Sequence, residues 1–483
     1  MSAIALAPLP DDTPDPVISR DPASGAVLMQ TWPTNLEAQI AAARAAYAGW
    51  ACQPLSTRVD AVRRLTGALR QRSQEFAETI ARDTGRPMWD CFAEVEAALA
   101  RVDGCVRAYA DRCAHRRHES GANGAVAVRH KPMGVLAVIT TFCQPMLTPL
   151  SHIAPAILAG NAVVFKPSSR ALPTALLIED CIKRAGLAAN IVQIAVAQGE
   201  AAMDLAAHDG VDGVLFSGST QVGQNLARRI AGRPGKLLSL DMGGNNAIVV
   251  WDTPQIEDAA MLVVQSAFTA SGQRATCARR LIVREAMAEP LLGAVKRLAD
   301  RIICGAPSDE TTPFMGPLID NRAADGLVQS FIWLMSRGGR PIKHMARLDP
   351  QRPFISPAII DVTDMRERPD VELFGPLLQV IRVPDFDTAI AQANATRYGL
   401  VSALIGGTQE EYNRFWANVR TGLTHWNRAT ITELPGVPSG GVGLSGNFRP
   451  GGYYEADSCA YPVSSAEMDH PRAMIGTGFA PEI

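Results

Sequence analysis

The residues that could do chemistry in this 483-residue chain follow short apolar runs. AVVFKPSSR places Lys166 at the end of an expected strand, where an ammonium group is costly unless a ligand or solvent receives it. VLFSGSTQVG places Gly218 and Gly223 at a strand-to-helix turn, where the free amides of the helix favour phosphate and glycine lets a ligand approach closely. The plainer interpretations are a surface lysine and a tight turn, so each run alone indicates a nucleotide site only weakly.

Three further runs carry ionisable or reactive side chains. LSLDMGGNN holds Asp241, VITTFCQPMLTP holds Cys143, and VELFGP holds Glu372 and Phe374. On its own, ELFGP predicts only a turn that ends a helix, and a lone cysteine is most often buried and inert. The stretch SGQRATCARR, which follows an expected helix, has Ala275 at its centre.

These runs, in this order, resemble the aldehyde dehydrogenase superfamily, and the resemblance covers the chain from about Ile18 onward. The segment PSGGVGLSGNFRPGG, together with THWN around Asn427, matches a further run of that family. Within the superfamily, LDMGGNN, GQRATCARR, SGNFRP and YYEADSCAYP are most similar to the succinylglutamate-semialdehyde dehydrogenases of arginine catabolism. The resemblance implies NAD(P)-dependent oxidation of an aldehyde to a carboxylate.

The resemblance also implies a set of dinucleotide contacts. Lys166 would contact a ribose, the turn at Gly218 would lie under the pyrophosphate, Glu372 would hold the nicotinamide ribose, and Phe374 would flank the ring. Ser169 stands where the family usually has a glutamate that holds the adenosine ribose hydroxyls. Losing that carboxylate removes repulsion against a 2′-phosphate, so NADP is at least as well supported as NAD. The complete expected set is Lys166, Ser169, Gly199, Gly218, Ser219, Gly223, Glu372 and Phe374.

The departures from the family pattern fall on the reaction itself. Ala275 occupies the position of the nucleophilic cysteine, and a methyl group cannot attack an aldehyde. Asp241 occupies the position of the glutamate general base, one methylene short. The register set by SHIAPAILAGN puts Cys143 where the family has an asparagine that donates to the oxyanion. Nucleophile, base and oxyanion donor are therefore all changed.

Several interpretations remain open. The first is a catalytically impaired or inactive protein that keeps a dinucleotide pocket and acts by binding or regulation. The second is a working oxidoreductase in which Asp241 activates water, or in which Cys143 is a relocated nucleophile; Cys277 is expected to serve packing. The third is a structural protein that binds no nucleotide. An alanine introduced deliberately to trap substrate is less favoured, because the base and oxyanion positions differ too.

Composition restricts the class of protein. A net charge of -2 and a pI near 6.5 give no basic surplus, so neither nucleic acid nor a membrane surface is an expected partner. Nine scattered cysteines without metal-like spacing favour a reducing, cytoplasmic location and no metal site. The N-terminus lacks the pattern of a signal peptide. The expected partners are a small aldehyde or carboxylate ligand, further copies in a homodimer or homotetramer, and a partner protein.

The expected fold is α/β: a Rossmann-type parallel-sheet cofactor domain, an α/β catalytic domain and a small β oligomerisation arm. The cofactor domain is expected over 1–119 and 134–242, the catalytic-type domain over 243–450, and the arm over 120–133 and 451–475. Periodicity predicts one helix from Ser56 to Gly85. It also predicts alternating strands and helices from VLAVIT onward, with a mixed α+β domain as the alternative.

Overall fold

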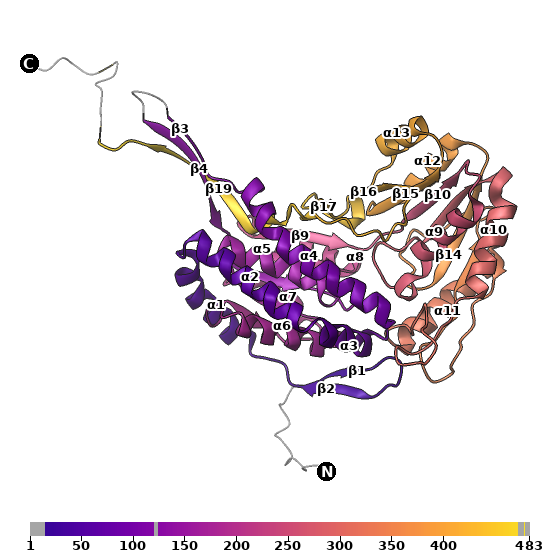
Figure 1. The fold of residues 1–483 in the computed structure, drawn as a ribbon, viewed down its shortest axis with the longest axis horizontal. Coiled ribbons are helices and arrows are strands. Elements are labelled where there is room, and N and C mark those ends of the chain that lie inside the picture. The colour runs from indigo at the N-terminus through magenta and orange to yellow at the C-terminus, as the bar shows by residue number, and fades with distance from the viewer. Residues whose placement is uncertain (1–14, 120–123, 472–477, 479–483) are drawn as a thin grey trace, which may run out of the picture.

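The computed structural model describes residues 15–119, 124–471 and 478. Two α/β layered bodies and a projecting arm make up the molecule (Figure 1). The first body contains a five-stranded parallel sheet. Its strands, in spatial order, are β7 (Val192–Ile194), β6 (Ala162–Lys166), β5 (Val135–Ile139), β8 (Gly213–Gly218) and β9 (Leu237–Met242).

Helices cover both faces of this sheet because successive strand residues point to opposite sides. Leu136 and Val138 of β5 pack on one face, whereas Val135, Ala137 and Ile139 pack on the other. The helices on the first face are α2 (Leu55–Gln71), α3 (Ser73–Thr84), α4 (Met88–Arg112), α5 (Leu147–Ala159) and α6 (Leu172–Arg184). Those on the second face are α1 (Leu36–Ala51), α7 (Ala201–Ala207) and α8 (Thr220–Ile230).

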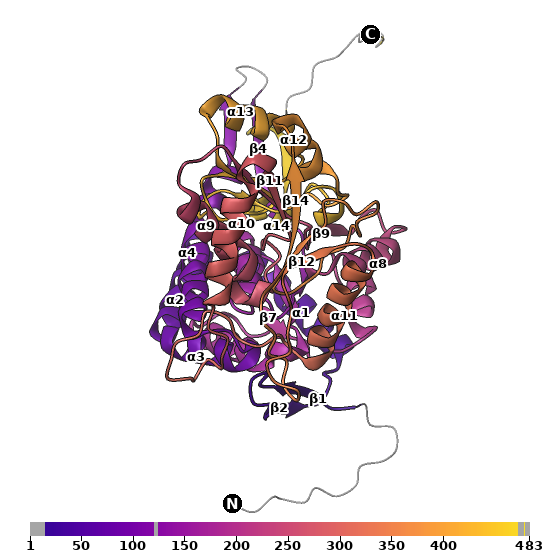
Figure 2. The same ribbon diagram turned by 90° about the vertical axis from the view of Figure 1, so that its right-hand side faces the viewer.

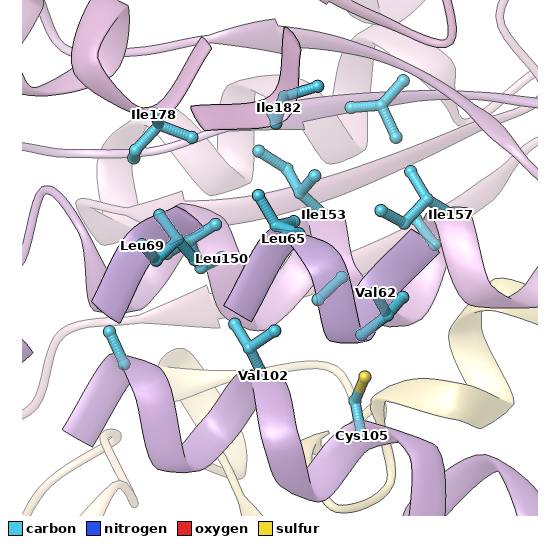
Figure 3. Packing of buried hydrophobic residues seen from close by; sticks show 14 of the residues in the cluster. Val62, Leu65, Leu69, Val102, Cys105, Leu150, Ile153, Ile157, Ile178 and Ile182 are labelled. Carbon is cyan, nitrogen blue, oxygen red and sulfur yellow. The ribbon is translucent and has the colours of Figure 1, made fainter. Parts of the chain in front are cut away.

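Helix α5 is the centre of the first core. Leu150, Ile153 and Ile157 follow helical spacing, and all three are fully buried. Figure 3 shows Ile153 between Leu65 of α2 and Ile182 of α6, and all three residues belong to one cluster with these helices. This packing fixes the rotation of α5 and therefore the direction in which its polar residues point.

The second body contains a seven-stranded sheet that is parallel except for its edge strand β12. Its strands, in spatial order, are β12 (Arg340–Lys343), β13 (Ala358–Asp361), β14 (Leu377–Val383), β11 (Arg280–Arg284), β10 (Ala247–Trp251), β15 (Val401–Gly406) and β16 (Leu423–Trp426). Its helices are α9 (Ile256–Phe268), α10 (Glu285–Asp300), α11 (Asn321–Ser336), α12 (Phe386–Asn394) and α13 (Gln409–Asn418). Two apolar clusters, one on each face, again sandwich the sheet.

The arm is a three-stranded antiparallel sheet that leaves the first body (Figure 1). It consists of β3 (Arg116–Glu119), β4 (Ala125–Pro132) and β19 (Ala460–Glu467), and β19 pairs with all of β4. Short α14 (Glu455–Cys459) leads into β19, and the two-residue strands β17 (Pro438–Ser439) and β18 (Gly451–Gly452) pair beside it. The hairpin of β1 (Val17–Arg20) and β2 (Val27–Thr31) lies at the lower end of the described fold in the view of Figure 2.

The predicted α/β class with two parallel-sheet bodies and a β arm is confirmed. The prediction of one helix from Ser56 to Gly85 is wrong, because Arg72 leaves helical geometry and separates α2 from α3. The parts of the expected cofactor and arm segments at 1–14, 120–123 and 472–475 lie outside the described residues. Of the helices that the structure describes, none combines the length and the hydropathy that crossing a bilayer demands.

Candidate active site

The carboxyl ends of the first sheet bring several sequence-predicted residues to one edge. Lys166 ends β6, Gly218 ends β8, and Asp241 is the penultimate residue of β9. The register of β8 and β9 places Ser217 opposite Asp241. In open parallel sheets this edge is where ligands bind.

The turn from β8 into α8 is the expected phosphate site. Ser219 caps α8 by accepting a hydrogen bond from the amide of Val222 at 3.4 Å, and the other first-turn amides stay available. A Cβ on Gly223 would lie 2.3 Å from the sulfur of Met242. Gly223 is therefore required for packing α8 against β9, a role that sequence reasoning did not foresee.

The remaining residues expected on the adenosine side lie along the same edge. Lys166 is half-buried, and burial lowers the pKa of its ammonium group. Among the described residues it has no ion-pair partner, which fits a ligand contact. Ser169 is half-buried, and the following Arg170 pairs with Asp320 at 2.5 Å. Gly199 is exposed with a φ of 57°, so it lies in a left-handed turn.

Glu372 and Phe374 approach this edge from the second body. Burial raises the pKa of Glu372, against the opposing effect of Arg279, whose guanidinium lies 3.4 Å away. Arg279 also stands 5.2 Å above the ring of Phe374. A Cβ on Gly243 would lie 1.8 Å from a carboxylate oxygen of Glu372, so glycine there is a condition for this approach.

The loop that carries Ala275 is held by a dense set of hydrogen bonds to its backbone. Ala270 and Ser271 have positive φ values of 53° and 55°. The Asn246 side chain donates to the carbonyl oxygen of Ala275 at 2.6 Å and to that of Cys277 at 2.9 Å. None of these bonds uses the side chain of residue 275.

A buried ion network fixes the same loop from the other side. Arg274 pairs with Asp90 at 2.5 Å, and Arg86 pairs with Asp90 at 2.6 Å. Glu94, which pairs with Arg86, accepts from the amides of Met146 and Leu147 at 2.8 and 3.1 Å. Although burial opposes ionisation, Arg86 and Arg274 lower the pKa of Asp90. Sequence reasoning missed this network, because Arg274 and Asp90 are 184 positions apart.

A cleft with a cavity volume of about 120 Å³ lies between the two bodies and is lined by Ala275 and Asp241. Burial raises the pKa of Asp241 to about 6, with the charge of His152 acting in the opposite direction. A group with such a pKa changes ionisation near neutral pH. The other polar lining residues are Arg101, Gln144, Thr148, Ser151, His152, Ser217, Ser239, Thr276, Thr432, Glu433, Ser439, Arg449 and Glu455.

The thiols lie elsewhere. Cys277 is fully buried and donates to the carbonyl oxygen of Thr269 at 3.5 Å, as its expected packing role requires. Cys143 is half-buried, and burial raises the pKa of its thiol to about 12. Among the described residues that line the cleft, none is a cysteine. Within the same described residues, no group of three or more histidine, cysteine or acidic side chains is arranged to hold a metal ion.

Comparison with known proteins agrees with this architecture. Residues 11–462 match the model of the aldehyde dehydrogenase family. The chain is 54% identical over 462 residues to an N-succinylglutamate 5-semialdehyde dehydrogenase of Novosphingobium aromaticivorans, covering 96% of this chain and 98% of the relative.

Two solved structures show the same fold with dinucleotides bound. One is a point mutant of betaine aldehyde dehydrogenase of Staphylococcus aureus in complex with NAD+ (TM-score 0.90, 21% identity, covering 96% of this chain and 95% of that one). The other is the NADP-dependent glyceraldehyde-3-phosphate dehydrogenase of Bacillus halodurans in complex with NADP (TM-score 0.84, 25% identity, covering 93% and 95%). Since the family model spans nearly the whole chain, this protein belongs to the aldehyde dehydrogenase family.

Proposed function

We propose that this protein binds NAD or NADP and a semialdehyde or carboxylate ligand in the cleft, and that its thiol-dependent oxidation of the aldehyde is lost or severely impaired. The observation that carries the proposal is the methyl group of Ala275 on the cleft wall, in a lining that includes no cysteine among its described residues. Without a thiol, no thiohemiacetal forms, and Asp241 has no covalent intermediate to serve.

The proposed dinucleotide contacts are those of the first sheet edge and of the Glu372 segment. The first-turn amides of α8 would receive a phosphate, and the ammonium group of Lys166, which has no ion-pair partner in the part of the chain that the structure describes, would receive a ribose hydroxyl. Glu372 and Phe374 would hold the nicotinamide end, since both approach the same edge. When bound, the nicotinamide would serve as hydride acceptor.

The ligand class follows from the charges of the cleft and from the relatives. Arg101 and Arg449 line the cleft beside the carboxyl groups of Asp241, Glu433 and Glu455, and each guanidinium group offers a place for one carboxylate of a ligand. A semialdehyde that carries carboxylates, as in the name of the relative from Novosphingobium, fits this lining. Arginine catabolism is the corresponding metabolic setting.

We also expect the family's homo-oligomeric assembly, with the arm reaching a second copy. Val126 of β4 and Tyr461 of β19 are 48% and 42% exposed, and exposed apolar side chains on a projecting sheet are typical of an interface. The proposal includes a regulatory role for this protein beside an active relative.

A second candidate is an active oxidoreductase in which Asp241 activates water. The observation that favours it is the position of Asp241 on the cleft wall, where burial raises the pKa of its carboxyl to about 6. NAD(P)H production from semialdehydes separates the two. We expect no steady production by the unaltered chain and recovery when Ala275→Cys, Asp241→Glu and Cys143→Asn are combined. Turnover by the unaltered chain would favour the second candidate. Thermal stabilisation by either dinucleotide is expected in both cases, and its absence would contradict cofactor binding.

A further inference from the structure

The segment that carries Glu372 and Phe374 has no regular secondary structure of its own. It connects β13 to β14, and within its residues 362–376, all of which the structure describes, the chain forms neither helix nor strand. A connection of this kind keeps a fixed position only through hydrogen bonds and packing against other parts of the fold. The place of the Glu372 carboxylate therefore depends on the residues that anchor the segment.

Asp370, two residues before Glu372, anchors the segment through both oxygens of its carboxylate. One oxygen accepts from the hydroxyl group of Thr396 at 2.5 Å and from the side-chain amide of Asn245 at 3.1 Å. The other accepts from the backbone amide and from the guanidinium group of Arg397 at 2.8 and 3.3 Å. Although burial opposes ionisation, the hydrogen bonds lower the pKa of Asp370, so its carboxyl group is charged near neutral pH.

Asn245 belongs to the run that follows Asp241, and this run touches the Glu372 segment at two points. A Cβ on Gly243 would lie 1.8 Å from a carboxylate oxygen of Glu372, so the backbone passes directly beside that carboxylate. Two residues later the side chain of Asn245, which is 4% exposed, donates to Asp370. The close approach at Gly243 and the hydrogen bond at Asn245 together leave the Glu372 carboxylate little freedom to move.

The neighbouring Asn246 holds the loop of Ala275 through the carbonyl oxygens of that loop. Two successive asparagines thus fix the Ala275 loop and, through Asp370, the segment of Glu372. The other amide atom of Asn245, Oδ1, is buried and has no hydrogen-bond partner among the described residues. A buried amide that leaves its oxygen unpaired is costly where only packing is required. The bond from Asn245 to Asp370 therefore indicates a role in positioning.

We propose that Asp370 and Asn245 are positioning residues for the dinucleotide: their hydrogen bond sets the place of the Glu372 carboxylate and so determines the affinity for the nicotinamide half. This role rests on the proposed function, because Glu372 is taken there as the contact of the nicotinamide ribose. Neither Asp370 nor Asn245 is part of the described lining of the cleft, so each acts through Glu372. Lys166 and the turn before α8, which would hold the adenosine half, do not depend on this anchor.

The four donor groups around Asp370 require a carboxylate. An asparagine in its place would offer a single acceptor oxygen, and its amide nitrogen would face the donors on the other side. Opposed donors in a partly buried network are costly, and a segment without its own hydrogen-bond ladder relieves that cost by moving. Asp370→Asn should therefore displace Glu372, although the volume of the substituted side chain is nearly unchanged.

The first experiment compares whole dinucleotides with their adenosine halves by isothermal calorimetry on the full chain. NAD+ is compared with ADP, and NADP+ with 2′,5′-ADP. Asp370→Asn should weaken the binding of both dinucleotides about tenfold, because the displaced carboxylate no longer reaches the ribose hydroxyls, and should change the affinity for each half less than about twofold. Thr396→Val removes one of the four hydrogen bonds and should act in the same direction more weakly. If Asp370→Asn did not fold, the comparison in Thr396→Val would decide.

Asp364→Asn is the matched control, because Asp364 lies in the same segment but is exposed, in a surface pair with Arg340 at 2.9 Å. It should leave all four affinities unchanged. Equal weakening of a dinucleotide and of its adenosine half by Asp370→Asn would show general structural damage and overturn the positioning role, as would unchanged affinities. In the unaltered chain, a dinucleotide that bound no more tightly than its half would contradict the Glu372 contact of the proposed function and, with it, the role of the two positioning residues.

The second experiment needs no nucleotide and follows amide hydrogen exchange of the full chain by mass spectrometry of its peptides. The amide of Arg397 donates to Asp370, and that of Gly375, within the Glu372 segment, donates to the carbonyl oxygen of Leu373 at 3.0 Å. Both amides should exchange at least about fivefold faster in Asp370→Asn than in the unaltered chain. Faster exchange at Arg397 alone would show that Asp370 does not hold the Glu372 segment, and would overturn the proposal.

Discussion

The two walls of the cleft differ in what they offer a ligand. The loop around Ala275 is anchored through its backbone and through Arg274, and it presents a methyl group. The opposite wall, at the ends of β8 and β9 and on α5, presents Ser217, Asp241 and His152. One wall keeps a precise shape without a reactive atom, and the other concentrates ionisable groups whose pKa values are shifted.

This difference teaches that the shape of a catalytic loop and its reactivity depend on different atoms. The bonds from Asn246 to the carbonyl oxygens of Ala275 and Cys277 do not involve the side chain of residue 275. A cysteine can therefore be replaced there at little structural cost. The reverse substitution should then restore reactivity at equally little cost.

The largest expected effect comes from that reverse substitution. Ala275→Cys should raise the rate of NAD(P)H production from a semialdehyde by at least roughly 1,000-fold, since loss of a covalent nucleophile costs up to about a millionfold. The measurement is absorbance of the reduced cofactor under steady-state conditions. Ala275→Ser is the control: it adds an atom of similar position but no thiolate, and should stay near the unaltered rate. Equal rates in the Cys and Ser variants would contradict the assignment of this position.

The loop wall can be broken through its buried ion network. Asp90→Asn leaves Arg86 and Arg274 without their shared counter-charge, and breaking such a buried network typically costs about 3–5 kcal/mol. The free energy of unfolding, measured by denaturant titration, should fall by that amount. Asp103→Asn breaks a pair with Arg70 at 2.9 Å whose side chains are 50% and 61% exposed, so it should cost less than about 1 kcal/mol. Equal losses of unfolding free energy in the two variants would mean that burial does not determine how much an ion pair contributes to stability.

The sequence predicts the strands that form the cleft but not every break between its helices, and the reason is physical. Short apolar runs such as VLAVIT, separated by segments with helical spacing, predict parallel strands. These signals are local, because each depends only on neighbouring residues in the sequence. The break at Arg72 was missed, since apolar spacing continues through it and only the tertiary packing of α2 and α3 reveals the change of direction.

Local patterns also failed for the polar side chains that line the cleft. His152 lies inside an apolar helix, and its hydrogen-bond partner Glu455 is 303 positions away, so neither carries a local signal of the other. The Arg274–Asp90 pair was invisible for the same reason. What a motif does show is position: Ala275 and Asp241 do line one cleft. The thiol of Cys143, by contrast, is absent from the described lining of that cleft.

The role of the polar wall can be tested at Asp241. In an Ala275→Cys background, Asp241→Glu should raise the rate about 10- to 100-fold, because a displacement near 1 Å costs about a hundredfold at a catalytic group. In the Ala275→Cys variant that keeps Asp241, the rate should increase as pH rises through about 6. At that pH the Asp241 carboxyl loses its proton and becomes able to act as a base. Asp241→Asn should remove this limb. A rising limb that survives in the Asn variant would assign the titration to another group.

The smallest expected effect concerns the proposed dinucleotide site at the carboxyl edge of the first sheet, away from both walls of the cleft. Ser169 is proposed to contact the adenosine ribose and supplies no carboxylate there, and the following Arg170 pairs with Asp320, so NADP should bind at least as tightly as NAD. Ser169→Glu adds a negative charge that repels a 2′-phosphate, and should shift the ratio of the two dissociation constants about tenfold toward NAD. Isothermal calorimetry measures both constants, and Ser169→Gln controls for size without charge. If the Gln and Glu variants shifted the ratio equally, volume and not charge would govern cofactor choice, and Ser169 would lose its assigned role.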